Sequence, residues 1–489
     1  MRQAGVLLHI SSLPNEYGIG SLGKEAYEFI DFLKESGQKI WQILPIGPTS
    51  YGDSPYSSLS SFAFNPYFID LEILVKDGLL DEKDLPIKDI SRKVDYGYLY
   101  NTRIGILYKA FLNRKPYEKE FEEFIKEEDY WLEDFALYTV LKHEHDAKAW
   151  NEWYDDFKFK NPQAISWAKN EFKNQILERK FYQFLFYKQW QKLKKYANKN
   201  GIRIMGDIPI YCAYDSADVW ANPKLFQLDD NLNPTFVAGC PPDAFTEDGQ
   251  LWGNPLYNYD VMKEDNYSWW VKRVKHSLKM YDILRIDHFR GFAGYYSIPF
   301  EDTTAKNGKW REGPGYDLFA AINKECPNAD IVAENLGFLT DDVEELLDKC
   351  GFPGMHIFQF EYGDGIKNIP LKKKFKENTI IYSGTHDNQT IMSFYNEQNE
   401  HYKKLTDSIC KIKFTDRPNL KIIEYCMKQN NDYCIIPLQD YLGLTDEVAR
   451  MNEPSTIGRN WCFRSLKMDF SNELKEYILK ITTKYNRIN

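Results

Sequence analysis

Short apolar runs that end in polar, Gly or Pro residues recur along the whole chain and form its most regular pattern. Runs that are apolar at nearly every position are typical of strands buried on both faces of a parallel sheet. Eight such runs are present, at residues 5–14, 39–48, 202–211, 282–291, 330–335, 355–361, 379–388 and 432–439. The pattern therefore predicts eight buried parallel strands.

Helical patterns lie between these runs. Residues 25–36 are amphipathic and close with Gly37, and residues 341–350 carry acids in the first turn and stop at Gly351. Strands that alternate with helices predict a (β/α)8 TIM barrel, here a single catalytic unit over residues 1–489. A doubly wound sheet is the alternative fold.

Two connections are longer than a simple barrel needs. Residues 51–200, between the second and third strands, are charged, aromatic and mostly helical in pattern, which predicts an inserted helical subdomain. Residues 212–280, between the third and fourth strands, form a second insertion with a Gly-, Pro- and aromatic-rich loop at 238–257. Long connections in compact domains are usually functional or disordered, and this loop is too aromatic for disorder.

The fourth run ends in a group of charged residues. Side chains alternate across a strand, so Ile283, Arg285 and Asp287 share one face. A cation beside a carboxylate favours its ionised form. His288 follows at once. Such a carboxylate can act as a nucleophile, a metal ligand or half of a structural ion pair.

Further acids stand at the ends of other predicted strands. Asp207 ends the third, Glu334 the fifth and Asp387 the seventh, where His386 precedes it. Active sites of barrels form at the C-terminal ends of the strands. These acids therefore predict an acid–base or metal site.

Two chemistries fit this set of residues. In the first, Asp287 attacks an anomeric carbon while Glu334, preceded by apolar residues and with a raised pKa, protonates the leaving oxygen. In the second, the acids bind a divalent cation with His288 or His386. The chain has no His-x-x-x-His or Asp-x-Asp cluster with local ligand spacing, so we expect no metal and no other cofactor.

Composition narrows the partners and the compartment. The 489 residues include 34 Tyr, 31 Phe and 12 Trp; we expect many of them in the core, and a surplus beyond packing needs would suit stacking on sugar rings. A formal charge of −10 without any basic run argues against nucleic acid. We expect no membrane association, because the first residues lack the apolar core of a signal peptide and no apolar stretch could span a bilayer. Scattered cysteines favour a reduced, cytoplasmic protein. We expect a monomer or a small homo-oligomer.

Three short motifs carry a family resemblance. RIDHFRG (285–291), AENLG (333–337) and GTHDN (384–388), in this order, resemble the catalytic motifs of the 4-α-glucanotransferases called amylomaltase or disproportionating enzyme, which are relatives of the α-amylases. Similar stretches run almost end to end, at 47–56, 206–211, 241–257 and 450–454. Two positions depart from the family pattern, since Ser455 and Arg459 stand where Gly is usual.

The resemblance implies a role for each matching position. Asp287 would be the nucleophile that forms a covalent glucosyl–enzyme, Glu334 the general acid and base, and Asp387 a third carboxylate that binds hydroxyls of the reacting glucose. The remaining substrate contacts would be Arg285, His288, His386, Asp207, Tyr51, Tyr56, Asp243, Trp252 and Asn460.

The activity implied is the retaining transfer of α-1,4-glucan segments, as in starch, glycogen and maltodextrin metabolism. A maltooligosaccharide would be the donor, and the 4-hydroxyl of another glucan or of glucose the acceptor. The 238–257 loop is the candidate lid that keeps water from the intermediate. The alternatives are an α-amylase-type hydrolase, a glycogen-debranching transferase and a non-catalytic glucan-binding or sensor protein.

Overall fold

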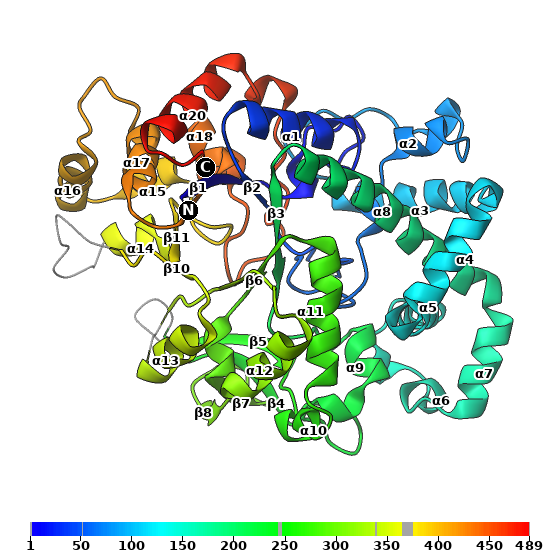
Figure 1. Cartoon of the computed structure of the whole chain (residues 1–489). Coiled ribbons are helices and arrows are strands. Elements are labelled where there is room, and N and C mark those ends of the chain that lie inside the picture. The colour runs from blue at the N-terminus through cyan, green and yellow to red at the C-terminus, as the bar shows by residue number, and fades with distance from the viewer. Residues whose placement is uncertain (1, 51, 243–246, 338–339, 364–374, 489) are drawn as a thin grey trace.

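Eight parallel strands form the central sheet of the computed structural model, which describes residues 2–50, 52–242, 247–337, 340–363 and 375–488 (Figure 1). The strands follow one another in the sheet in the order β10-β11-β12-β1-β2-β3-β6-β9. Their bounds are β1 (Gln3–Leu7), β2 (Ile40–Gln42), β3 (Arg203–Ile208), β6 (Ile283–Ile286), β9 (Ile331–Ala333), β10 (Gly354–Ile357), β11 (Thr379–Tyr382) and β12 (Tyr433–Pro437). Each predicted run supplies one of these strands, so the predicted (β/α)8 barrel is confirmed.

The barrel closes between β9 and β10 through two bonds, each of which joins a residue of one strand to a residue just outside the other. The Ala333 N–H donates to the carbonyl oxygen of Pro353 at 2.9 Å. The Met355 N–H donates to Oδ1 of Asn335 at 2.7 Å. The ladder of the other strand pairs is thus replaced at this seam by one backbone bond and one side-chain bond.

Helices surround the barrel (Figure 1). The two helices read from the sequence are α1 (Lys24–Glu35) and α13 (Asp341–Cys350), and Gly37 and Gly351 follow them with φ angles of 72° and 70°. A positive φ is the conformation that glycine adopts at little cost after a helix. Further helices along the chain are α11 (Ser268–Met280), α12 (Gly315–Glu325), α14 (Phe358–Tyr362), α15 (Ile391–Glu397), α16 (Glu400–Cys410), α17 (Pro418–Lys428), α18 (Leu438–Leu442), α19 (Asp446–Ala449) and α20 (Asn472–Lys484).

A further group of helices lies between β2 and β3, at the right of Figure 1. They are α2 (Leu71–Lys76), α3 (Tyr96–Leu112), α4 (Glu118–Glu127), α5 (Asp129–Glu144), α6 (Asp155–Lys158), α7 (Pro162–Glu171) and α8 (Lys173–Lys199). The last of them, α8, also packs on the barrel, where the Trp190 indole donates to the carbonyl oxygen of Met280 at 2.9 Å. That residues 51–200 form a subdomain of their own stays a prediction.

A small antiparallel sheet, which the sequence did not predict, lies below the barrel in Figure 1. Its order is β5-β4-β7-β8, and its strands are β4 (Phe236–Cys240), β5 (Gln250–Pro255), β7 (Gly294–Pro299) and β8 (Lys309–Glu312). The short helices α9 (Ala217–Ala221) and α10 (Tyr259–Glu264) flank β4 and β5 in the chain. The stretch 238–257, expected to be a loop, therefore contains strand residues at both ends, and β4 pairs with β7 across a long separation in sequence.

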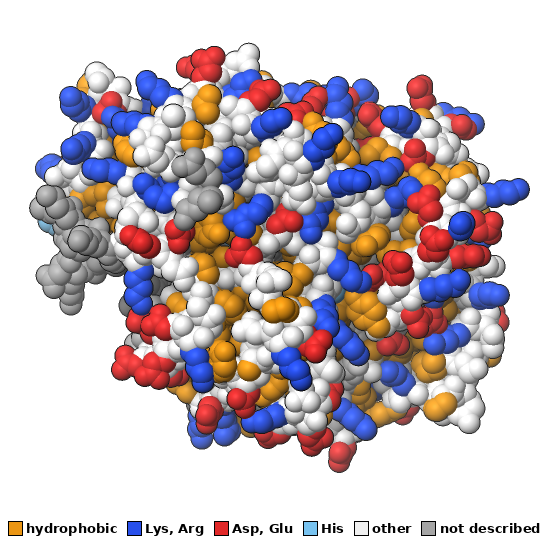
Figure 2. Space-filling view, viewed as in Figure 1, with side chains coloured by type: hydrophobic (Ala, Val, Ile, Leu, Met, Phe, Trp, Pro, Cys, Tyr) orange, Lys and Arg blue, Asp and Glu red, His pale blue; other side chains and the backbone are white. Residues whose placement is uncertain are grey.

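The surface carries mixed charge. On the face seen in Figure 2, Lys and Arg side chains are interspersed with Asp and Glu side chains. Among the residues that the structure describes, we find no helix with both the length and the apolar character that crossing a bilayer requires.

Candidate functional site

Backbone bonds extend the barrel ladder beyond the strand ends and fix two of the acids. The Asp287 N–H donates to the Ile208 carbonyl at 3.0 Å, and the Glu334 N–H donates to the Ile286 carbonyl at 3.0 Å. Asp287 and Glu334 are thus positioned as the next residues of β6 and β9, although their strands formally end one residue earlier. Both carboxyl groups are held at the C-terminal end of the barrel, as predicted for its active site.

The Arg285 guanidinium lies at the centre of three carboxyl groups. Nη1 is 2.5 Å from Oδ2 of Asp207 and 3.0 Å from Oδ1 of Asp287, and Nη2 is 3.7 Å from Oε2 of Glu334. The contact to Asp207 follows from the register, because Asp207 and Arg285 are direct neighbours on β3 and β6. Burial raises the pKa of Asp207 to about 6 although Arg285 opposes this shift.

Glu334 has the surroundings of a general acid. Burial raises its pKa well above the ordinary value, and the nearby Asp287 charge adds to this effect. Arg285 and the backbone N–H of His288, which donates to Oε2 at 2.5 Å, oppose the shift without cancelling it. The carboxyl group of Glu334 therefore keeps its proton to a higher pH than a free glutamate does.

His288 adopts a backbone conformation that is uncommon for a residue other than glycine. Its φ is 51°, a left-handed value that functional sites often retain despite a cost of about 1–3 kcal/mol. In this conformation its N–H reaches Glu334 while its ring lies edge-on to Trp252, with ring centroids 4.8 Å apart. Burial lowers the pKa of the His288 ring to about 4, so the ring is neutral near pH 7.

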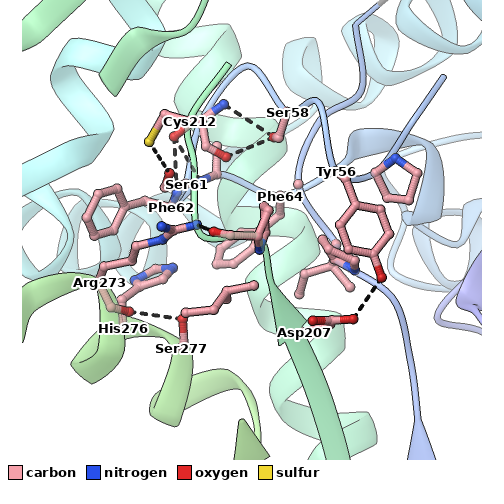
Figure 3. A pocket seen from close by; sticks show the side chains of 18 of the residues that line it. Tyr56, Ser58, Ser61, Phe62, Phe64, Asp207, Cys212, Arg273, His276 and Ser277 are labelled. Atoms are coloured by element: carbon pink, nitrogen blue, oxygen red, sulfur yellow. Dashed lines mark hydrogen bonds between the residues drawn. The ribbon is translucent and has the colours of Figure 1, made fainter. Parts of the chain in front are cut away.

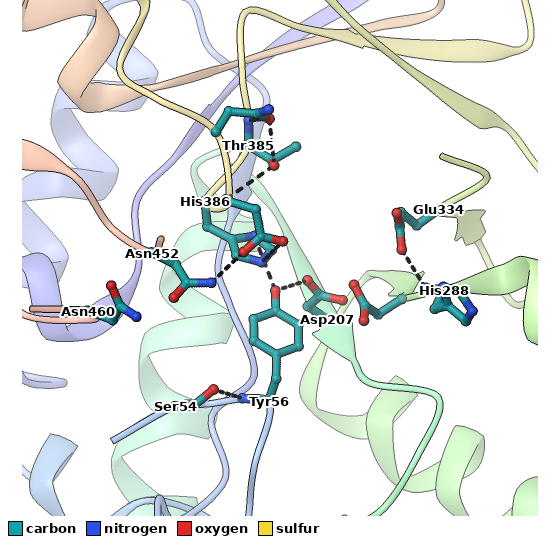
Figure 4. A network of polar contacts seen from close by, with 12 residues as sticks. Ser54, Tyr56, Asp207, His288, Glu334, Thr385, His386, Asn452 and Asn460 are labelled. Carbon is teal, nitrogen blue, oxygen red and sulfur yellow. Dashed lines mark hydrogen bonds and ion pairs between the residues drawn. The ribbon is translucent and has the colours of Figure 1, made fainter. Parts of the chain in front are cut away.

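The third acid, Asp387, belongs to a polar network with His386 and Asn452, two residues that Figure 4 labels. His386 Nε2 is 3.2 Å from Oδ2 of Asp387, and the Asn452 amide donates to Oδ1 at 2.6 Å. Partial desolvation opposes ionisation, but His386 and Asn452 outweigh it and lower the pKa of Asp387 to about 2. Asp387 is therefore an anion at any pH at which the protein would work.

Tyr56 connects this network to the group around Arg285. Its hydroxyl donates to Oδ2 of Asp207 at 2.7 Å and lies 3.3 Å from Nδ1 of His386. Its ring stacks on the His386 imidazole, with centroids 4.7 Å apart and planes inclined by 17°. A change at Asp387 can thus reach Asp207 through two side chains.

An open cavity of about 480 Å³, a size typical of small-molecule sites, is bordered by Tyr56, Asp287, His288, His386 and Asp387. Its lining residues are Ser54, Tyr56, Pro209, Ile210, Tyr211, Gln250, Leu251, Trp252, Asn254, Asp287, His288, His386, Asp387, Asn452, Pro454, Ser455 and Trp461. The side chain of Trp252 is 37 % exposed, which leaves it accessible to a ligand. Aromatic rings on the walls and carboxylates inside are a combination that suits a sugar.

A second, much smaller cavity of about 50 Å³ lies behind Tyr56 and Asp207 (Figure 3). Arg273 and His276 of α11 line it as well, and both are almost fully buried. This volume is far below that of ordinary ligand sites. The two cavities share three lining residues, Tyr56, Pro209 and Tyr211, which therefore lie between them.

The structure brings together most of the predicted site residues. The large cavity is bordered by Tyr56, Trp252, Asp287, His288, His386 and Asp387. Arg285 contacts Asp287 and joins it to Asp207 and Glu334. Tyr51 and Asp243 lie outside the described residues. Asn460 bonds within its own loop, because its amide accepts from the Glu453 N–H at 3.0 Å and donates to the Thr456 carbonyl at 3.0 Å. The functional role of each of these residues stays a prediction.

Asn452 and Trp461 border the cavity but were not predicted. Asn452 binds Asp387, and the Trp461 ring lies 5.8 Å from the rings of both Tyr56 and His386. For Asn452 the available signal was the stretch 450–454, which contains it and resembles the family. Among the described residues, no group of three or more His, Cys, Asp or Glu side chains is suited to hold a metal ion.

Comparisons with known proteins agree over nearly the whole chain. A family model described as 4-alpha-glucanotransferase matches residues 8–468. The 4-alpha-glucanotransferase of Clostridium butyricum is 45 % identical over 98 % of this chain and 100 % of its own length, and that of Aquifex aeolicus is 42 % identical over 100 % of both. The structure of an amylomaltase from Streptococcus agalactiae in complex with acarbose superimposes with a TM-score of 0.96 at 40 % identity, covering 100 % of both chains.

Proposed function

The chain belongs to the 4-alpha-glucanotransferase family, and from this premise we propose that it transfers glucan segments by a retaining double displacement. The family is one of transferases that rearrange glucans in starch and maltodextrin metabolism. The proposed donor is a maltooligosaccharide or longer α-1,4-glucan, and the acceptor is the 4-hydroxyl of another glucan or of glucose. The relative solved with acarbose supports a carbohydrate ligand in the large cavity.

In the first step, a carboxylate oxygen of Asp287 attacks the anomeric carbon of the donor. The bond from that carbon to the glycosidic oxygen breaks, and Glu334 gives its proton to the departing oxygen. The products of this step are a shortened glucan with a free 4-hydroxyl and a glucan ester on Asp287. Inversion at the anomeric carbon has taken place once.

In the second step, the 4-hydroxyl of the acceptor attacks the same carbon. Its proton passes to the Glu334 carboxylate, and the ester bond to Asp287 breaks, which restores both side chains. A second inversion gives net retention. Asp387, held as an anion, would bind hydroxyl groups of the reacting glucose and favour the positive charge that develops on its ring.

The observation that carries this proposal is the arrangement around Arg285. Asp287 and Glu334 contact different terminal nitrogens of one guanidinium, at 3.0 and 3.7 Å, which keeps the two carboxyl groups close together. Retaining enzymes need two carboxyl groups about 5–5.5 Å apart. The raised pKa of Glu334 supports its role as the acid, while Asp287 lies nearer the cation and suits the nucleophile.

Pure maltotriose distinguishes transfer from hydrolysis. We expect glucose together with oligosaccharides longer than three units, because a second maltotriose molecule serves as acceptor. Chromatography of the products over time makes the measurement. Products no longer than the substrate would indicate an α-amylase-type hydrolase, and unchanged maltotriose would favour a glucan-binding protein without this activity.

The pH dependence of kcat/KM should be bell-shaped. As pH falls below about 6, protonation of Asp207 removes the charge that fixes Arg285, so activity should decline. As pH rises through the elevated pKa of Glu334, the acid loses its proton and activity should decline again.

A donor that needs no acid tests which group causes the alkaline decline. The fluoride ion leaves α-maltotriosyl fluoride without receiving a proton. The rate of fluoride release in a single turnover should therefore not decline at alkaline pH, unlike the rate with maltotriose. An alkaline limb of equal size with both donors would contradict the assignment to Glu334. Replacing Asp207 by Asn should remove the acid limb while lowering the maximum rate.

The 238–257 stretch supports a further part of the proposal. Trp252 on β5 contacts His288 at the cavity edge, so this stretch is the proposed lid that keeps water from the ester. Residues 243–246 lie outside the described residues. A cytoplasmic location and a monomeric or small oligomeric state are parts of the same proposal.

A further inference from the structure

The backbone around Asp387 is held from outside by the segment that follows the last barrel strand. Nη2 of Arg450 donates to the Asp387 carbonyl oxygen at 2.9 Å. Two residues later in that segment, the Asn452 N–H donates to the His386 carbonyl oxygen at 3.0 Å. The polypeptide on which Asp387 stands is thus bonded to residues more than sixty positions away.

Arg450 uses each of its side-chain nitrogens for a different acceptor. Nη1 donates to Oδ2 of Asp446 at 2.8 Å, and Nε donates to the Asn452 carbonyl oxygen at 2.6 Å. With the bond to Asp387, three acceptors are bound in one plane. A planar guanidinium can satisfy this geometry, whereas the point charge of a lysine cannot.

Asp446 completes the arrangement on the other side of Asp387. Its Oδ1 accepts from the Thr390 N–H at 2.6 Å, at the start of α15, while its Oδ2 binds Arg450. Its own N–H donates to Oγ of Ser393 at 2.9 Å. One carboxylate therefore ties the residues after Asp387 to the arginine that holds Asp387 itself.

We propose that Arg450, fixed by Asp446, is a positioning residue that sets the place of the Asp387 carboxylate in the cavity. The side chain of Asp387 is 48 % exposed, so packing against neighbours cannot define its position alone. A displacement of about 1 Å at a reacting centre can cost about 100-fold in rate. This inference rests on the proposed function, in which Asp387 binds the reacting glucose.

The first variant to test is Arg450→Lys, which keeps the positive charge but loses the planar guanidinium that binds the three acceptors. We expect kcat for maltotriose disproportionation to fall about 10- to 100-fold while KM changes less than about threefold, since the bond acts on placement of a group used in the transition state. Arg417→Lys is the matched control, because Arg417 is exposed and its Nη2 also bonds a carbonyl, that of Leu442, at 3.4 Å. The control should retain wild-type kinetics.

A double-mutant cycle separates positioning from a general structural effect. In an Asp387→Asn background, Arg450→Lys should lower the residual activity by less than about twofold, because the group that it positions is already lost. Losses that multiply in the double variant would overturn the proposal, as would wild-type kinetics of Arg450→Lys. If Arg450→Lys does not fold, Asp446→Asn, which keeps the acceptor for Thr390, takes its place in the same cycle and is read in the same way.

The proposed function fails in a different manner. Full activity of Asp387→Asn would show that Asp387 does not act in the reaction, and the bond from Arg450 to Asp387 would then have no effect on catalysis. An inactive Asp387→Asn together with an unaffected Arg450→Lys would refute only the positioning role.

Discussion

Asp287→Asn should reduce disproportionation of maltotriose by between about 10⁴- and 10⁶-fold, a loss of the size seen when a catalytic nucleophile is removed. An amide is close in shape to a carboxylate but cannot form the ester with the anomeric carbon. Arg285 keeps its 2.5 Å contact with Asp207, so we expect the fold and the cavity to persist. Chromatographic measurement of glucose and of the longer oligosaccharides gives the rate.

A suitable control replaces an aspartate at the other end of the same strand. Asp282 precedes β6, and its Oδ2 accepts from the Ile204 N–H at 2.8 Å, a bond that an asparagine oxygen can keep. Asp282→Asn should therefore retain activity within about twofold of the wild type. Identical products and rates from Asp287→Asn and the wild type would refute the role of Asp287.

Glu334→Gln should lower activity by about 10²- to 10⁴-fold, the usual contribution of a general acid and base. The glutamine oxygen can still accept from the His288 N–H, which now donates to Glu334. What the variant lacks is a proton for the leaving oxygen and a base for the acceptor hydroxyl. Glu344→Gln on the exposed side of α13 is the matched control and should behave as the wild type.

The same variant offers a direct view of the covalent intermediate. With α-maltotriosyl fluoride the first step needs no acid, while the second step still lacks its base. The ester on Asp287 should accumulate, and the intact mass of the protein should increase by one maltotriosyl group. The absence of this adduct, with fluoride released at a wild-type rate, would contradict a double displacement through Asp287.

The barrel and the acids at its strand ends could be read from the sequence because their signals are local. An apolar run marks each strand, and Glu334 or Asp287 follows its run directly. The bridge between Asp207 and Arg285 is not local, since it depends on the register of β3 against β6. The sequence therefore predicted which acids meet, but not that one guanidinium joins three of them.

Other features could not be predicted because they depend on contacts between distant segments. The strands of the small sheet show little alternation of apolar and polar residues, and all four positions of β8 are exposed. Asn452 and Arg450 reach Asp387 from more than sixty residues further along the chain, through a loop that no periodic pattern marks. Within the 450–454 stretch, family resemblance indicated importance, but only the fold indicates what these side chains touch.

The carboxylates around the cavity also determine which ligands it can distinguish. Arg285 makes its shortest contact with Asp207, 2.5 Å against 3.0 Å for Asp287. Its positive charge is therefore neutralised mainly by Asp207, which does not border the cavity. Asp287 and Asp387, both of which border the open space, leave it with a surplus of negative potential. A neutral glucose gains little from such a potential, whereas a sugar ring that becomes cationic gains much. In the proposed function, this potential would favour charge over shape, and inhibitors with a protonated nitrogen near the anomeric position should bind tightly.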